Sequence, residues 1–141
     1  MDITFSLPAN FEGRSTDLED GRALRVLLDS LIELNLAFLE SHVAPTLYRS
    51  GVRYGRTRIW DTIPALYARG FGDCKSLSAA LIAQYRMGGI PCEPVFRFVR
   101  NADKTKDFHI LVQCPSGWED PSKKLGMGAN EVSKFYGPGA Y

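Results

Sequence analysis

The sequence contains few of the residues that build metal centres and disulfide frameworks, with three cysteines and two histidines among 141 residues. The cysteines, Cys74, Cys92 and Cys114, are odd in number and widely spaced, which argues against a disulfide framework. None of them forms the C-x-x-C pair that is typical of zinc sites, so we expect neither a metal nor an organic cofactor. Cys92 and Cys114 are expected to be small core residues.

The sequence also lacks an excess of charge and a long apolar run. Its 17 basic and 16 acidic residues give a net charge of +1, so the charge does not favour nucleic acid or an anionic membrane as a partner. A membrane-spanning helix needs about 18 or more consecutive apolar residues, and the sequence has no such run. Residues 1–10 have no basic region, so we expect no secretory signal and a protein that is cytoplasmic or incorporated into a virion.

Hydrophobic residues make up 45% of the sequence, which is enough for a folded core, and their spacing predicts helices before strands. A capping box of Thr16 and Glu19 predicts the start of the first helix. The predicted elements are helices over residues 17–42, 59–68 and 74–87, followed by strands over residues 93–99, 108–114 and 118–120. This order is typical of an α+β fold in which helices pack on an antiparallel sheet.

The length of the chain predicts a single domain over residues 1–141. Its core would span about residues 59–123, after an N-terminal helical part over residues 1–58. The Gly-rich C-terminal tail, residues 126–141, has no clear periodicity and is predicted to be irregular.

Cys74 follows Gly72 and Asp73 at the predicted start of a helix. Backbone N–H groups and the helix dipole at such a position favour the thiolate and can stabilise an oxyanion, so Cys74 is the candidate nucleophile. Gly72 would let a substrate approach closely, and Asp73 would order the turn before the helix. The alternative is a buried structural cysteine.

A nucleophilic cysteine needs a base, and the two histidines differ in their setting. His42 falls at the end of the first predicted helix and has no obvious partner. His109 projects from a predicted strand, which is a rigid element suited to proton transfer. We therefore expect His109 to be the base, and the alternative is a satisfied core histidine.

The third member would be a carboxylate on the neighbouring strand. If residues 114–117 form a hairpin loop, Gln113 pairs with Trp118, and Asp120 lies on the same face of the sheet as His109. Asp120 would then accept a hydrogen bond from the imidazole. A slip of the register by one residue would make Glu119 the substitute.

Three sequence motifs occur in a recognisable order: residues 72–81 (GDCKSLSAAL) leading to the turn GIP, residues 108–112 (FHILV) and residues 118–122 (WEDPS). Over about residues 59–123 they resemble the transglutaminase-like superfamily. The resemblance implies a papain-like core, with the cysteine-bearing helix packed on a small antiparallel sheet, and a triad of Cys74, His109 and Asp120. In some relatives an upstream Trp donates its indole N–H to the oxyanion, a role that would fall to Trp60, for which a core position is the alternative.

The same resemblance implies a hydrolase or acyltransferase that acts on amide bonds of peptides or proteins through a thioester. The alternative function is that of a structural or interaction protein on the same fold, such as a phage virion or tail component, with or without a working triad. Contacts with other subunits of a phage or bacterial assembly would then use the first helix, the Gly-rich tail or the basic segment of residues 49–58. The arginines of this segment (Arg49, Arg53, Arg56 and Arg58) could instead bind a substrate that carries a carboxylate.

Overall fold

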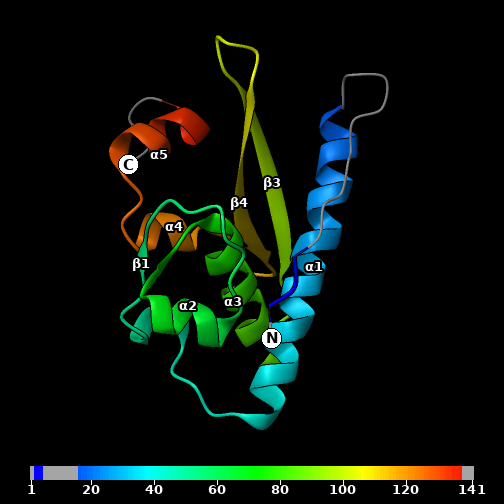
Figure 1. Cartoon of the computed structure of the whole chain (residues 1–141), viewed down its shortest axis with the longest axis vertical. Helices are drawn as coiled ribbons and strands as arrows, with labels where there is room; N and C mark the ends of the chain where they lie inside the picture. The colour runs from blue at the N-terminus through cyan, green and yellow to red at the C-terminus, as the bar shows by residue number, and fades with distance from the viewer. Residues whose placement is uncertain (1, 5–15, 138–141) are drawn as a thin grey trace.

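The computed structural model describes residues 2–4 and 16–137, and its central element is the helix α3 (Cys74–Met87). One side of α3 packs against the long helix α1 (Asp17–Ser41), and another packs against the strand β4 (Lys106–Cys114). Figure 1 shows α1 along one edge of the molecule and the β3–β4 hairpin rising beside it. The fold is of the α+β class, as the sequence predicts.

The remaining elements are short and connect or flank this centre. They are the 3-10 turn η1 (Leu47–Arg49), the strands β1 (Arg53–Tyr54), β2 (Phe71–Gly72), β3 (Glu93–Arg100) and β5 (Gly117–Glu119), and the helices α2 (Ile63–Arg69), α4 (Pro121–Lys124) and α5 (Ala129–Tyr136). β3, β4 and β5 form an antiparallel sheet with β4 in the middle, whereas β1 and β2 pair in parallel.

Both long helices form for reasons visible in the sequence. The hydroxyl of Thr16 accepts a hydrogen bond from the backbone of Glu19, whose carboxylate accepts one in return, so the predicted capping box starts α1. Alanine and serine occupy much of the first ten residues of α3, all of which are buried. These small side chains allow α1 and the sheet to approach α3 closely, and Leu77, Leu81 and Ile82 fill the space between them.

Helix α2 is displaced from its predicted position over residues 59–68 and runs from Ile63 to Arg69. Pro64 explains the later start, because proline lacks a backbone N–H and fits only the first turn of a helix. Gly70 ends α2 in a left-handed conformation at φ 85°, which glycine adopts without steric cost.

The C-terminal tail was predicted to be irregular, and this prediction is wrong for residues 129–136, which form α5. The helix packs against β3, and its side chains reach the sheet near His109. Residues 138–141 lie outside the described part of the chain.

Cys92 and Cys114 contact the core as expected, but the expectation that the cysteines form no disulfide is wrong for these two residues, which are bonded to each other. In the β3–β4 register Glu93 lies opposite Gln113, so Cys92 stands opposite Cys114 with a Cα–Cα distance of 4.4 Å. That separation suits a disulfide and an antiparallel pair without hydrogen bonds. The odd number of cysteines was misleading because one of them, Cys74, stays free.

Candidate active site

Cys74 is the first residue of α3 and is reached directly from β2. The side chain of Asp73 caps the helix by accepting a hydrogen bond from the backbone N–H of Lys75 at 3.2 Å. At Gly72, a Cβ atom would lie 2.6 Å from Cδ1 of Leu66, so any larger residue would force the buried side chain of Leu66 to shift. The structure thus gives Gly72 a packing role, and Gly72 is not among the residues that line the cavity at Cys74.

The helix that carries Cys74 is tied to the strand that carries the histidine. One turn after Cys74, the buried hydroxyl of Ser78 donates a hydrogen bond to the carbonyl oxygen of Ile110 at 3.1 Å. Ile110 follows His109 in β4, so this bond fixes the position of α3 along β4 and therefore the position of Cys74 relative to the imidazole. A bond of this kind contributes about 1 kcal/mol, and its greater effect is to define one register between helix and strand.

His109 lies in the middle of β4 and is 2% exposed. Its Nε2 atom is 2.6 Å from Oδ2 of Asp120, and Phe135 of α5 stacks on the ring with centroids 5.0 Å apart. Because Nε2 is engaged by the carboxylate, Nδ1 is the ring nitrogen left for a reacting group. A carboxylate that holds one nitrogen fixes both the tautomer and the orientation of an imidazole.

Asp120 is held from several sides. It caps α4, with Oδ1 accepting hydrogen bonds from the backbone N–H groups of Ser122 at 2.9 Å and Lys123 at 3.3 Å. Its Oδ2 atom also accepts a hydrogen bond from the hydroxyl of Tyr136. Burial acts to raise the pKa of Asp120, but the hydrogen bonds from His109, Tyr136 and the backbone outweigh it and lower the pKa below its ordinary value.

The predicted hairpin register is confirmed for the pairs that the sheet forms. Gln113 lies opposite Trp118 and Val112 opposite Glu119, so Asp120 follows directly after the last pair. Glu119 is not a substitute for Asp120, because its carboxylate accepts hydrogen bonds from the hydroxyls of Tyr48 and Tyr85.

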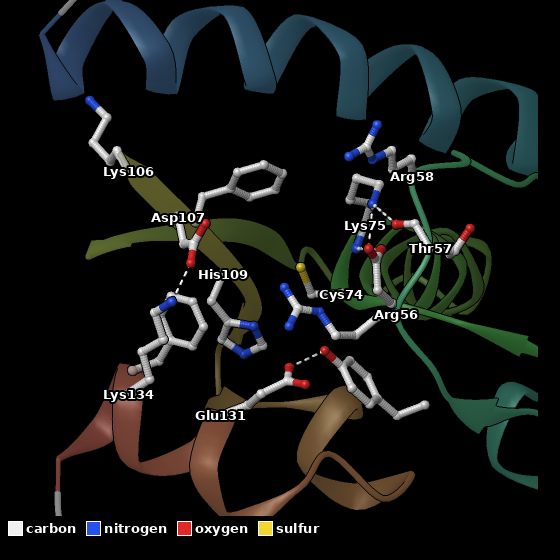
Figure 2. Close-up of a pocket in the computed structure, with 14 residues that line it drawn as sticks. Arg56, Thr57, Arg58, Cys74, Lys75, Lys106, Asp107, His109, Glu131 and Lys134 are labelled. Carbon is white, nitrogen blue, oxygen red and sulfur yellow. Dashed lines mark hydrogen bonds and ion pairs between the residues drawn. The ribbon is translucent and has the colours of Figure 1, made fainter. Parts of the chain in front are cut away.

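Cys74 and His109 open into the same cavity, which has a volume of about 450 Å³. Figure 2 shows the sulfur of Cys74 beside the imidazole of His109, with Arg56 and Glu131 nearby. Asp120 does not line this cavity and lies behind the histidine. The chain therefore brings together a thiol, an imidazole and a buried carboxylate in the order that a cysteine triad requires.

The ionisation of Cys74 differs from the expectation that the helix N-terminus favours the thiolate. Burial, followed by the negative charge of Asp73, raises the pKa of the Cys74 thiol to about 12, although a backbone hydrogen bond with Ile110 acts in the opposite direction. Desolvation outweighs the helix dipole because the side chain is removed from water and sits beside a carboxylate. Burial therefore favours the neutral thiol of Cys74 over the thiolate.

The other two predicted site residues have different surroundings. Asp73 lines the cavity and pairs with Lys75, in keeping with its predicted role in ordering the turn. Trp60 is half-buried against the core, and the ammonium of Lys75 lies 5.7 Å from its ring centroid. Trp60 is not among the residues that line the cavity.

Sequence reasoning missed the contribution of α5, which places Phe135 and Tyr136 against His109 and Asp120. The available signals were weak: Gly128 and Gly137 flank the helix, Glu131 lies in its first turn and Lys134 in its last. Eight residues with these signals do not stand out in a glycine-rich tail.

Two properties of the described residues bear on the other expectations. Within residues 2–4 and 16–137, no group of three His, Cys, Asp or Glu side chains is arranged to hold a metal ion. No helix in the same part of the chain has the length and apolar character needed to cross a membrane.

Comparison with known proteins adds the family. No match was found for the chain among curated proteins or among solved structures. A family model for the transglutaminase-like superfamily matches residues 40–120, a segment that begins near the end of α1 and ends at Asp120. This segment is more than half of the sequence and contains Cys74, His109 and Asp120. The chain belongs to the transglutaminase-like superfamily.

Proposed function

We propose that the protein is a thiol-dependent hydrolase or acyltransferase that acts on amide bonds of peptides or proteins. Cys74 is the nucleophile, His109 the general base and acid, and Asp120 the residue that orients the imidazole. The observation that carries the proposal is the buried 2.6 Å contact between Nε2 of His109 and Oδ2 of Asp120, beside a cavity that His109 shares with Cys74. Membership of the superfamily supports cysteine-dependent chemistry.

The raised pKa of Cys74 decides how the first step proceeds. Since the resting thiol is neutral, His109 removes its proton as the sulfur attacks the carbonyl carbon, and a separate thiolate need not accumulate. The C–S bond forms, the carbonyl π electrons move to oxygen, and a backbone N–H at the start of α3 that is not engaged by Asp73 stabilises the oxyanion. The developing imidazolium is stabilised by the ionised carboxylate of Asp120.

The intermediate then collapses to a thioester. The C–N bond breaks, and the leaving amine takes the proton from His109. Water or an amine next attacks the thioester while His109 accepts its proton, and the sulfur leaves and is reprotonated as a thiol. Hydrolysis yields a carboxylic acid, whereas attack by an amine yields a new amide.

The test uses hydroxylamine, which intercepts an acyl-enzyme thioester as a hydroxamate. Wild-type protein incubated with casein and hydroxylamine is expected to form hydroxamate on the substrate or to release ammonia or new peptide ends. C74A and H109N are expected to lose this activity by at least about 10³-fold, as removal of a triad member does in other enzymes. Equal turnover by wild type and C74A would overturn the proposal, and circular dichroism verifies that the variants are folded.

A second candidate function, that of a structural or interaction protein, is favoured by one feature of α1. Leu18, Val26 and Leu34 on this helix are 68%, 61% and 48% exposed. Val26 and Leu34 line one shallow hollow together with Asp29, Ser30 and Glu33, which is a surface that partner subunits of a phage or bacterial assembly could cover. If this function holds, V26E and L34E abolish a self-association or partner complex seen by sedimentation, and a monomer without partners counts against it.

A further inference from the structure

The cavity beside Cys74 is lined by many charged side chains, and most of them neutralise one another. The positive residues are Arg56, Arg58, Lys75, Lys106 and Lys134, and the negative ones are Asp73, Asp107 and Glu131. Which of these charges remain available decides what the cavity can bind.

The lysines are all engaged by carboxylates. The pairs are Lys75 with Asp73, Lys134 with Asp107, and Lys106 with Asp17 and Asp20. Glu131 accepts a hydrogen bond from the hydroxyl of Tyr54. Arg56 and Arg58 form no ion pair or hydrogen bond with any residue in the described part of the chain. The positive charge that remains for a ligand is therefore carried by arginine.

The backbone around Arg56 is fixed on both sides. The N–H of Gly55 donates to the carbonyl oxygen of Gly72 at 2.9 Å, immediately before Asp73 and Cys74. The carbonyl oxygen of Thr57 accepts a hydrogen bond from the ammonium of Lys75, which is itself buried, at 3.0 Å. Arg56 is thus anchored to the first turn of α3, while its guanidinium keeps its donors free.

The two arginines lie differently in the cavity. In Figure 2 the side chain of Arg56 reaches toward Cys74 and Glu131, whereas Arg58 lies at the other edge of the cavity. Among the described residues, Arg56 is therefore the cation beside the thiol that forms no ion pair, although its positive charge also helps to lower the pKa of the Asp107 carboxyl. A guanidinium offers a planar set of donors that matches a carboxylate, and desolvation costs it less than it costs an ammonium.

We propose that Arg56 binds a carboxylate of the substrate close to the amide carbonyl that Cys74 attacks. The substrate class is then peptides with an acidic side chain or a free C-terminal carboxylate beside the scissile amide. This inference rests on the function proposed above, in which Cys74 attacks that amide. The volume of about 450 Å³ accommodates a few residues of a peptide.

The test compares two alkylating reagents of similar size and different charge, iodoacetate and iodoacetamide. In both reactions the sulfur displaces iodide and forms an S–CH₂ bond, so the ratio of the two rates is independent of how much thiolate is present. With the Cys92–Cys114 disulfide intact, Cys74 is the free cysteine, and mass spectrometry of the labelled peptide verifies the site. The same protein in denaturing urea gives the ratio for an unperturbed thiol.

The folded wild-type protein is expected to favour iodoacetate at least about threefold more than the urea-unfolded chain does. R56Q abolishes this preference, and R56K retains part of it because the charge remains while the fork is lost. The matched control is R49Q, since Arg49 is an exposed arginine of the same basic segment that does not line the cavity. An unchanged ratio in R56Q, or an equal loss in R49Q, overturns the assignment.

The alkylation ratio needs no turnover, so its outcome is separate from that of the casein test. If the alkylation ratio depends on Arg56 but the protein has no amide activity, the carboxylate-binding site is supported and the proposed enzymatic function is refuted. Once an activity is measured, the KM values of paired peptides identify the source of the carboxylate. One pair differs by Glu or Gln beside the scissile amide, and the other by a free or an amidated C-terminus. R56Q is expected to raise KM about tenfold for the acidic member alone, and an equal rise for the neutral member contradicts the proposal.

Discussion

Replacing Asp120 with asparagine removes the charge that faces His109 and keeps an oxygen to cap α4. The His109–Asp120 contact is 2.6 Å long, and both side chains are buried. A hydrogen bond to a charged group contributes about 1.5–3 kcal/mol, and asparagine caps a helix about as well as aspartate. We therefore expect D120N to lower the free energy of unfolding by about 1.5–3 kcal/mol at pH 7.

Alanine at the same position removes more. The backbone N–H groups of Ser122 and Lys123 lose their acceptor, as does the hydroxyl of Tyr136. Loss of the cap costs about 1 kcal/mol and loss of the tyrosine bond about another, so D120A should be destabilised by about 4 kcal/mol. The control is E40Q, which removes an exposed carboxylate near the end of α1 and should change the free energy of unfolding by no more than about 0.5 kcal/mol.

The assay is urea unfolding at pH 7 and at about pH 3, followed by far-ultraviolet circular dichroism. Because the folded structure lowers the pKa of Asp120, the stabilisation is present above the unfolded pKa of about 3.9 and is lost as the pH falls through the lower folded value. The difference between wild type and D120N should therefore narrow on acidification. A difference that is absent at pH 7, or equally large at both pH values, would refute the assigned role of the carboxylate.

Three further perturbations test other parts of the structure. Reduction of the Cys92–Cys114 disulfide, which links residues 22 apart, should lower the free energy of unfolding in urea by about 3 kcal/mol, and no change on reduction would contradict the bridge. G72A places a Cβ atom 2.6 Å from Leu66 and should cost about 1–3 kcal/mol, with a lower Tm; an unchanged Tm would show that the turn has room. Y136F removes the hydroxyl that donates to the carboxylate of Asp120 and should cost about 1 kcal/mol; if the proposed triad operates, it should also reduce kcat with little change in KM, whereas a change in KM alone would point to substrate contact.

Local signals predicted much of the fold. The capping box at Thr16 and the bounds of α3 depend on a few neighbouring residues. The pairing of Gln113 with Trp118, which brings Asp120 behind His109, was also predicted, although Cys114 and Gly117 pair as well and the turn is shorter than the expected loop over residues 114–117. These features depend on spacing and on backbone geometry, which a sequence displays directly. The same holds for the family resemblance, since its motifs contain the three candidate triad residues.

Long-range packing was not predictable in the same way. The pKa of Cys74 depends on how completely α3 is surrounded, which no single motif specifies. Likewise, the contact of Tyr136 with Asp120 needs α5 to return across the sheet, and the helix itself has few signals of its own. The pairing of Cys92 with Cys114 follows from the β3–β4 register, whereas an odd count of cysteines points away from it.

The place of Tyr136 near the C-terminal end of α5 sets the order in which a newly made chain completes its site. Cys74 is synthesised 62 residues before Tyr136, so at typical rates of about 5–20 residues per second the thiol precedes the last support of the triad by about 3–12 s. Only after Asp120 has been made does the nascent chain carry the thiol, His109 and the carboxylate together, and Phe135 and Tyr136, which contact His109 and Asp120, are still to come. The contacts that hold the histidine–carboxylate pair are therefore complete only once α5 has been made and has docked against the sheet.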